Sequence, residues 1–242
     1  MLREFLSSVV DIIYPKVCLV CKNSLKNTSS IDNIICAQCW VKIKRNLPPF
    51  CHSCGRHLEK ANFNKNICPS CLKKSLHFDR AFSPCVYEGV VKELIHKFKY
   101  NDKDYLGSTL SKLMIEFIKE YNLPIECLDS IVPIPLHQTK LREREFNQAQ
   151  VLSNYIAAEF DKKVLDKTLI RHRLTKTQTE LETKARFVNV QGSFAITKKE
   201  DLKDKNILLV DDVLTTGATS SEAAYVLKNA GANIVFVLTL AD

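Results

Sequence analysis

The sequence predicts an α/β fold, a mainly parallel sheet flanked by helices, preceded by a small cysteine-rich module. Eight of the ten cysteines form four Cys-x-x-Cys pairs before residue 72, and apolar strand and helix patterns alternate after residue 77. Strands that alternate with helices build parallel sheets. The change of composition near His77 therefore predicts two domains within the 242 residues, at residues 1-77 and 78-242.

The paired cysteines have the spacing of zinc ribbons. Two Cys-x-x-Cys turns supply the four thiolates of one tetrahedral structural zinc site, which leaves no open position for catalysis. We predict two zinc ions bound by sequential quartets, although a cross-braced arrangement would use the same eight residues. The remaining Cys85 and Cys127 lie in apolar stretches, and we expect both to be buried core thiols. The quartets are Cys18, Cys21, Cys36 and Cys39, followed by Cys51, Cys54, Cys68 and Cys71.

Positive charge is concentrated in the cysteine-rich segment. The formal net charge is +8, and residues 1-77 hold 12 Lys/Arg against 4 Asp/Glu, whereas residues 78-242 hold 23 of each. Eight thiolates with two Zn²⁺ would reduce this excess to about +4. Basic residues interleaved with aromatic ones suit single-stranded DNA, and a solvated face of a small domain is the alternative. The candidate contacts are Trp40, which could equally be ribbon core, Lys42, Lys44, Arg45, Phe50 and Arg56.

No membrane insertion or export is expected from the sequence. The longest apolar runs, such as residues 234-238, are far shorter than the roughly 20 residues of a membrane-spanning helix. Residues 1-15 have helical periodicity but lack the apolar stretch of a signal peptide. A soluble, cytoplasmic protein is expected, because a reducing compartment also favours thiolate-metal sites over disulfides.

The second segment contains the alternating elements. Its strands are expected at residues 82-87, 129-135, 207-210 and 234-240, with short strand-like pieces at Leu169 and Phe194. Helices are expected at residues 91-100, 104-121, 147-160 and 220-230. Asn147 is a favourable N-cap and Gly231 is suited to end the helix before it.

Residues 207-219 combine three features of a phosphate and ribose site. An apolar strand places Asp211 and Asp212 at its carboxyl end, where ligands bind in open α/β sheets. The carboxylates suit a ribose diol or hydrated Mg²⁺, and the following amide-rich helix start suits a phosphate. A core strand followed by an ordinary capped helix is the alternative, whereas the six glycines fit neither a P-loop nor a dinucleotide-binding turn. The candidate ligand-binding residues are Asp211, Asp212, Thr215, Thr216, Gly217, Ala218 and Thr219.

This segment resembles the signature with which type I phosphoribosyltransferases bind phosphoribosyl pyrophosphate (PRPP). Nearly the whole chain is similar to the ComF competence family, whose members join zinc ribbons to a type I phosphoribosyltransferase-like domain. The further matching segments are Tyr87-Glu88-Gly89, Leu94-Ile95, Lys99-Tyr100, Val132 to Leu136 and Arg144 to Gln148, followed by Thr175, Gln178, Leu181, Arg186 and Asn189.

The resemblance also implies roles for individual residues. Leu136 to Arg144 would form the pyrophosphate-binding loop, with contacts from Leu136, Lys140 and Arg144, and His172 to Arg186 would form a hood over the site. Asp211 and Asp212 would be catalytic, easing positive charge on the ribose while Mg²⁺ and basic groups take up charge on the leaving pyrophosphate. Glu145 stands where the family has Gly; a positive φ there would cost about 1 kcal/mol, and its carboxylate would repel pyrophosphate.

Two classes of function follow from these expectations. The resemblance implies a cytoplasmic DNA-uptake factor for natural transformation that binds PRPP, single-stranded DNA and proteins of the competence machinery. The alternatives are a metabolic phosphoribosyltransferase acting on a base or amine, and a PRPP-sensing regulator without catalysis. No residue identifies the acceptor, because one fold serves many activities.

Overall fold

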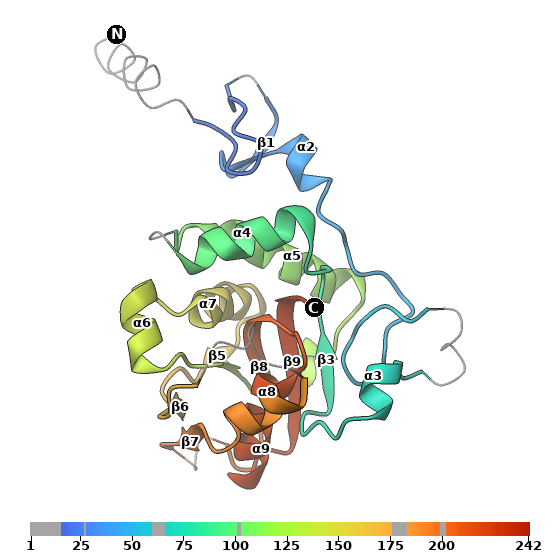
Figure 1. Cartoon of the computed structure of the whole chain (residues 1–242), viewed down its shortest axis with the longest axis vertical. Helices are drawn as coiled ribbons and strands as arrows, with labels where there is room; N and C mark the ends of the chain where they lie inside the picture. Colours follow the sequence, from blue (N-terminus) through green and yellow to red (C-terminus); the bar gives the residue numbers. More distant parts are fainter. Residues whose placement is uncertain (1–15, 27, 60–65, 101–102, 176–182, 199–201) are drawn as a thin grey trace.

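A five-stranded, fully parallel sheet forms the centre of the computed structural model (Figure 1). Its strand order is β3-β9-β8-β4-β5, and every neighbouring pair is parallel. The strands are β3 (Arg80–Phe82), β4 (Ser130–Pro133), β5 (Lys163–Val164), β8 (Asn206–Val213) and β9 (Ile234–Ala241). The structure describes residues 16-26, 28-59, 66-100, 103-175, 183-198 and 202-242.

Helices cover both faces of the sheet because the strands are apolar on both sides. On β8, Leu208 and Val210 belong to one buried cluster, whereas Ile207 and Leu209 belong to another. This alternation is the period of two that a pleated strand imposes. The first cluster includes α4 (Gly89–Lys99), α5 (Leu106–Glu120) and α7 (Gln148–Phe160), and the second includes α9 (Ala218–Asn229).

Shorter elements complete the second segment, and η2 lies at the amino end of β4. An antiparallel pair is formed by β6 and β7, and α8 packs against α9. The helix α6 follows β4, and the 3-10 helix η2 precedes it. Their bounds are β6 (Leu169–Arg171), β7 (Phe194–Ile196), α6 (Gln138–Arg144), α8 (Thr183–Val190) and η2 (Ile125–Cys127).

The first cysteine quartet belongs to a ribbon that lies beyond α4 and α5 (Figure 1). It contains β1 (Ser30–Ile31), β2 (Ile35–Cys36) and α2 (Ala37–Trp40). Asp32 connects it to α5, because its carboxylate accepts a hydrogen bond from the Thr109 hydroxyl at 2.8 Å and pairs with Lys112 at 2.5 Å. These contacts keep the pKa of Asp32 below its usual value, with the hydrogen bond from Lys112 as the main cause.

The second quartet belongs to a ribbon that shares a buried core with the sheet. Cys51, Cys54 and Leu58 are buried in the same cluster as Leu209 and Leu214. The backbone contact is close: the Ala81 N–H of β3 donates to the Ser53 carbonyl at 2.8 Å, and a Cβ on Gly55 would lie 2.4 Å from the Ala81 oxygen. This ribbon also contains the short helix α3 (Pro69–Leu72).

Buried Asn46 completes this docking. Its side-chain N–H group donates to the carbonyls of Gly55 and Ser83, both at 2.9 Å, and to the Asp242 carboxylate at 3.3 Å. Its side-chain oxygen accepts a hydrogen bond from the His57 N–H at 3.0 Å. One polar side chain therefore holds together three segments that are distant in sequence, with each buried polar atom satisfied.

The expected elements are largely confirmed, with differences at particular ends. Asn147 caps α7 by accepting from the Ala149 N–H at 3.1 Å. The strand expected at residues 82-87 is displaced to Arg80–Phe82, because β9 pairs with those three residues and the chain then turns toward the ribbon. Cys85 is fully buried as expected, but the expectation for Cys127 is wrong, because the end of η2 exposes it and its thiol bonds to the Pro124 carbonyl. Across the segments described, no helix combines the length and apolar character needed to cross a bilayer.

Candidate functional site

Asp211 and Asp212 end the buried part of β8 and point to opposite faces of the sheet. Asp212 continues the side of Leu208 and Val210, which α4 covers, so it meets Lys99 at the end of that helix. Their Nζ to Oδ2 distance is 2.8 Å, and the side chains are only 20% and 13% exposed. The Asp212 N–H donates to an Asp211 carboxylate oxygen at 2.8 Å, which ties the two acids together.

The acid pair has unusual protonation chemistry. Burial, followed by the charge of Asp212, raises the pKa of Asp211 to about 7. Burial would lower the pKa of Lys99, but the adjacent Asp212 carboxylate outweighs it, so the pKa of Lys99 lies above its usual value. At neutral pH the site therefore holds one firm ion pair and one carboxyl group that is readily protonated or ionised.

Two arginines add positive charge beside the acids. Arg171, on β6, stacks over Phe194 at 5.3 Å and donates to the Thr175 hydroxyl at 2.6 Å, and burial lowers its pKa. Arg144, at the end of α6, stacks over Tyr100 at 5.7 Å and donates to Gln148 at 3.0 Å. Among the described residues, the Nε atoms of both arginines are buried without a hydrogen-bond partner. Unused donors of this kind point to an anionic ligand.

The segment after β8 forms a loop that opens into α9. Gly217 has φ 80°, a left-handed conformation that favours glycine, and stands at the N-cap of the helix. Within the described parts of the chain, the amide N–H groups of Thr215, Thr216 and Gly217 donate no hydrogen bond. The Thr216 hydroxyl instead accepts from the Ala218 N–H at 3.4 Å. Free amides at the start of a helix are suited to a phosphate.

The segment expected to be a pyrophosphate loop is helical over most of its length. His137 caps α6 by accepting from the Thr139 N–H at 3.2 Å, so residues 138-144 are helix and not loop. Lys140 pairs with Glu143 on the same helix at 2.6 Å, and Leu136 precedes the helix half-buried. Glu145 does have the positive φ expected for a glycine position, at 64°, which ends α6 in a left-handed residue.

The eight paired cysteines come together as two sequential quartets. Within each quartet the sulfur atoms lie within 4.8 Å of one another, and the Cys21–Cys36 and Cys54–Cys68 sulfurs are 3.7 Å apart. Tetrahedral zinc with Zn–S bonds near 2.3 Å requires sulfurs about 3.8 Å apart. The quartets therefore fit two structural zinc ions, and the zinc would connect the two knuckles of each ribbon.

Close packing makes the thiols of each quartet depend on one another for their ionisation. Burial opposes ionisation of Cys18, but backbone N–H groups, led by that of Cys36 at 3.4 Å from the sulfur, lower its pKa to about 6. Burial and then the neighbouring thiols raise the pKa of Cys39 to about 12, and the adjacent Cys51 sulfur is the main cause of a similar rise for Cys71. Four adjacent thiols can ionise together only when a metal ion balances their charge.

The candidate DNA contacts in the ribbons are only partly available. Phe50 packs edge to face on Phe117 and Tyr121, at centroid distances of 5.6 and 5.1 Å, so it belongs to the core. Arg45 covers the half-buried Trp40 ring at 5.7 Å. Arg56 is bound to backbone carbonyls, which leaves Lys42 and Lys44 as the exposed members of the set.

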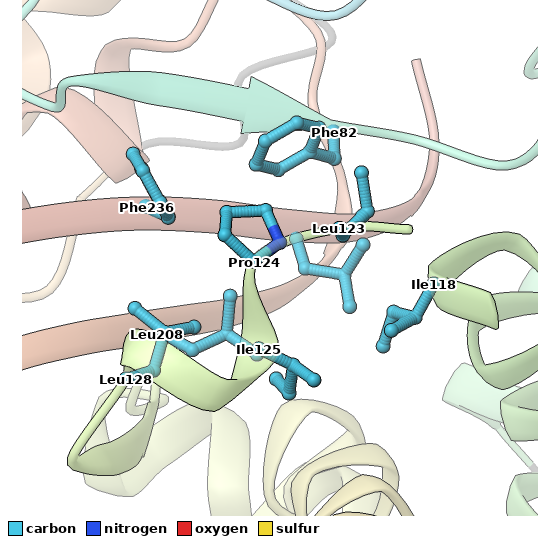
Figure 2. Close-up of a pocket in the computed structure, with 9 residues that line it drawn as sticks. Phe82, Ile118, Leu123, Pro124, Ile125, Leu128, Leu208 and Phe236 are labelled. Carbon is cyan, nitrogen blue, oxygen red and sulfur yellow. The ribbon is translucent and has the colours of Figure 1, made fainter. Parts of the chain in front are cut away.

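A separate small pocket has no polar chemistry. Figure 2 shows that side chains from α5, η2 and the sheet surround it, and all of its lining residues are apolar. They include Ile118, Pro124, Leu128 and Phe236. Without donors or charge it is not suited to a phosphorylated ligand, in contrast to the site at the end of β8.

Two residues of this site, Lys99 and Arg171, were not assigned a role from the sequence. Lys99 carried a signal, because it follows Ile95 by four residues and so shares a side with that buried residue. A charge at an apolar position of an amphipathic helix suggests a buried partner. Arg171 carried no such signal, since only the fold brings its charge near Asp211. The hood expected between His172 and Arg186 lies in part, at residues 176-182, outside the described residues.

Family models match the cysteine-rich segment and the C-terminal part of the chain. A double zinc ribbon domain model matches residues 9–77, and a phosphoribosyl transferase domain model matches residues 147–242. Among solved structures, the allosteric regulatory enzyme of purine biosynthesis is 18% identical, with a TM-score of 0.34 over 60% of this chain. The match covers only 26% of that enzyme, so it has no bearing on function here.

Three similar proteins align over almost the full length. Competence protein F of Haemophilus influenzae is 28% identical, over 93% of this chain and 96% of that protein. The DNA utilization protein YhgH of Escherichia coli K12 is 28% identical over 93% and 89%, and the Bacillus subtilis competence protein ComFC is 28% identical over 90% and 91%. Together, the two domain matches and these alignments show a chain with a double zinc ribbon before a phosphoribosyltransferase domain, similar over most of its length to competence protein F, YhgH and ComFC.

Proposed function

We propose that the protein is a ComF-like DNA-uptake factor for natural transformation that binds PRPP at the end of β8 and single-stranded DNA on its first ribbon. The names of its relatives and the phosphoribosyltransferase domain support this class of function. A reducing compartment such as the cytoplasm suits its paired thiols, and proteins of the competence machinery are the expected partners.

The observation that carries the PRPP proposal is the grouping of three kinds of polar group around one strand end. Asp211 and Asp212 would bind the ribose hydroxyls and a hydrated Mg²⁺. The N–H groups of Thr215 to Gly217, with Ala218 and Thr219 at the start of α9, would bind the 5′-phosphate. Arg144 and Arg171, with their unused donors, would bind the pyrophosphate, for which Leu136 and Lys140 are further candidates.

The affinity for PRPP with Mg²⁺ is expected to rise about tenfold between pH 6 and pH 8. The pKa of Asp211 is raised to about 7, so this carboxyl must lose its proton before it can bind Mg²⁺, and higher pH removes that cost. Titration calorimetry at several pH values measures the change.

The matched control for this experiment is Asp211→Asn, which keeps the side-chain shape but cannot titrate. Its affinity should be lower and should retain only the pH dependence that comes from the ligand phosphates. If the variant and the wild type show the same pH dependence, Asp211 is not the group that ionises. If the wild type binds no PRPP at any pH, the proposed ligand is wrong.

The DNA proposal rests on charge at the surface of the first ribbon. Five lysines of residues 16-44 are exposed, while their ribbon carries few acids. Such an excess of exposed positive charge attracts a polyanion without sequence preference. The lysines are Lys16, Lys22, Lys26, Lys42 and Lys44.

Replacing these five lysines with glutamine is expected to weaken binding of a single-stranded oligonucleotide more than tenfold. Each lost phosphate contact reduces the salt dependence, by about 0.7 in the slope of log K against log salt for single strands. Fluorescence anisotropy at several salt concentrations measures both. Substitution is preferable to deletion of residues 1-77, because deletion would remove Leu58 and other residues of the shared core.

The matched control is glutamine at five exposed lysines of the second segment: Lys163, Lys167, Lys198, Lys203 and Lys205. Both variants lose the same charge, so a general electrostatic effect would weaken both equally. Equal weakening of oligonucleotide binding in the two variants would show that the first ribbon is not the DNA site.

The site also suits the alternative activities. An acid pair beside ribose and arginines beside pyrophosphate are what a phosphoribosyltransferase needs, with Asp211 and Asp212 as its catalytic residues. Glu145 has a positive φ and supplies an acid at the position where the family has glycine. This difference favours PRPP sensing over turnover. Release of pyrophosphate from PRPP in the presence of bases and amines distinguishes a metabolic transferase from a sensor.

A further inference from the structure

The second ribbon contacts the phosphate loop through two basic side chains. The Arg56 guanidinium donates to the carbonyls of Leu214 at 3.1 Å and Thr215 at 2.6 Å. The Lys74 ammonium donates to the Thr216 carbonyl at 3.3 Å. Three consecutive peptide carbonyls therefore face the ribbon.

The direction of these carbonyls fixes the direction of the amides. A peptide unit is planar and trans, so its N–H points opposite to its C=O. The N–H groups of Thr215, Thr216 and Gly217 belong to the same three peptide units, and they must therefore point away from the ribbon. These are the N–H groups that donate no hydrogen bond among the described residues.

The two basic residues are themselves held firmly. Arg56 follows the first knuckle of the second quartet, just beyond Cys54, and its Nε lies 3.9 Å from the Asp242 carboxylate. Lys74 follows α3, just beyond the ligand Cys71, and lies 5.9 Å from the centre of the Phe187 ring on α8. The next turn of the ribbon also reaches α9, because the His77 N–H donates to the Ser221 hydroxyl at 3.0 Å. Each anchor is thus attached to a cysteine knuckle of the second quartet.

We propose that the second zinc ribbon positions the phosphate-binding amides. Arg56 and Lys74 bind the loop carbonyls on one side, so that the N–H groups point toward an anion on the other side. The proposal deepens the proposed PRPP function and rests on it for the identity of the anion. Arg56 and Lys74 are positioning residues, since the carbonyls that they bind face away from the phosphate. The integrity of the second metal centre would thereby regulate the affinity of the loop, while the first metal centre would not.

The test compares two ligands that use different parts of the site. Arg56→Met and Lys74→Met are each expected to lower the affinity for ribose 5-phosphate about tenfold, in line with the loss of a charge-assisted hydrogen bond. Affinity for inorganic pyrophosphate, which the arginines Arg144 and Arg171 would bind, should change less than twofold. Arg56→Lys, which keeps a cationic donor group, should recover part of the loss. Calorimetry measures the affinities, and metal analysis should give two zinc ions for every variant.

The control variant is Lys228→Met. Lys228 also donates to a backbone carbonyl, that of Asn233 at 3.2 Å, but at the far end of α9. It should leave both affinities unchanged. Equal loss of ribose 5-phosphate and pyrophosphate binding in the Arg56 and Lys74 variants would overturn the proposal, since that result indicates general misfolding. Unchanged ribose 5-phosphate binding would also overturn it.

A ligand-free measurement separates this proposal from the proposed function. Hydrogen exchange over residues 211-219 should become faster in Arg56→Met and in Cys71→Ser, but not in Lys228→Met or in Cys36→Ser of the first ribbon. If the wild type binds neither ligand and exchange still responds in this way, the PRPP function fails while the anchoring stands. Exchange that is unchanged in Arg56→Met would refute the anchoring whatever the ligand.

Discussion

Lys99→Met is expected to destabilise the fold by about 3 kcal/mol, the largest effect of any single substitution in the site. The Lys99–Asp212 pair is mostly buried, and removing one partner leaves an uncompensated charge in a region of low polarity. Asp211 is the next residue in the chain, so the repulsion between the two carboxylates would also lose the cation that offsets it. Urea denaturation followed by circular dichroism measures the loss.

The double variant Lys99→Met/Asp212→Asn is the control for this prediction. It removes both charges together, and most of the lost stability should return, because replacing a buried ion pair by neutral residues is often nearly neutral. Loss of the same 3 kcal/mol in the double variant would show that packing of the lysine stem, and not its charge, supports the helix end. Both variants should lose Mg²⁺-dependent PRPP binding, since either one disturbs the acid pair.

Gly217→Val is expected to reduce the affinity for ribose 5-phosphate about a hundredfold. At φ 80° a β-branched residue is strained, and relaxing that strain would rotate the amides of the loop. The added atoms would also meet the ribbon, because a Cβ would lie 3.4 Å from Leu76 and 3.7 Å from Phe78. The glycine therefore preserves the packing between the loop and the ribbon. It also allows the phosphate to approach the backbone closely.

Gly192→Val provides a matched control, since Gly192 has φ 65° and nothing lies within 4 Å of the position that a Cβ would take there. Both substitutions carry a similar backbone cost, but only one lies in the loop. Calorimetry with ribose 5-phosphate and with pyrophosphate should show a selective loss of phosphate binding for Gly217→Val alone. Equal losses in the two variants would assign the effect to global strain.

Local patterns in the sequence predicted much of this structure. The cysteine spacing predicted the two quartets, and the apolar run before Asp211 predicted the central strand together with the acids at its end. These predictions succeed because their signals are short: a knuckle spans four residues, and a strand and its following turn are continuous.

Contacts between distant segments could not be predicted in the same way. Arg56 was interpreted as a DNA contact, because a basic residue in a ribbon has no local mark that distinguishes an exposed charge from one that binds a carbonyl 158 residues later. The pairing of Lys99 with Asp212 and the position of Arg171, on the separate β6–β7 pair, depend on how distant segments are arranged in the fold, which periodicity does not encode. The exposure of Cys127 was missed for a similar reason, since its apolar neighbours suggested burial that η2 does not provide.

The docking of the second ribbon has a consequence for folding on the ribosome. Its two knuckles are synthesised early and can take up metal as soon as they emerge, but the Asn46–Asp242 contact that secures them joins residues 196 positions apart. The strand β3 likewise has β9 as its partner in the sheet. Until β9 has been synthesised, the ribbon exposes Cys51, Leu58 and Phe78, which later become core. Such late, long-range closure slows folding and leaves apolar surface exposed during translation, when a nascent chain is prone to aggregation.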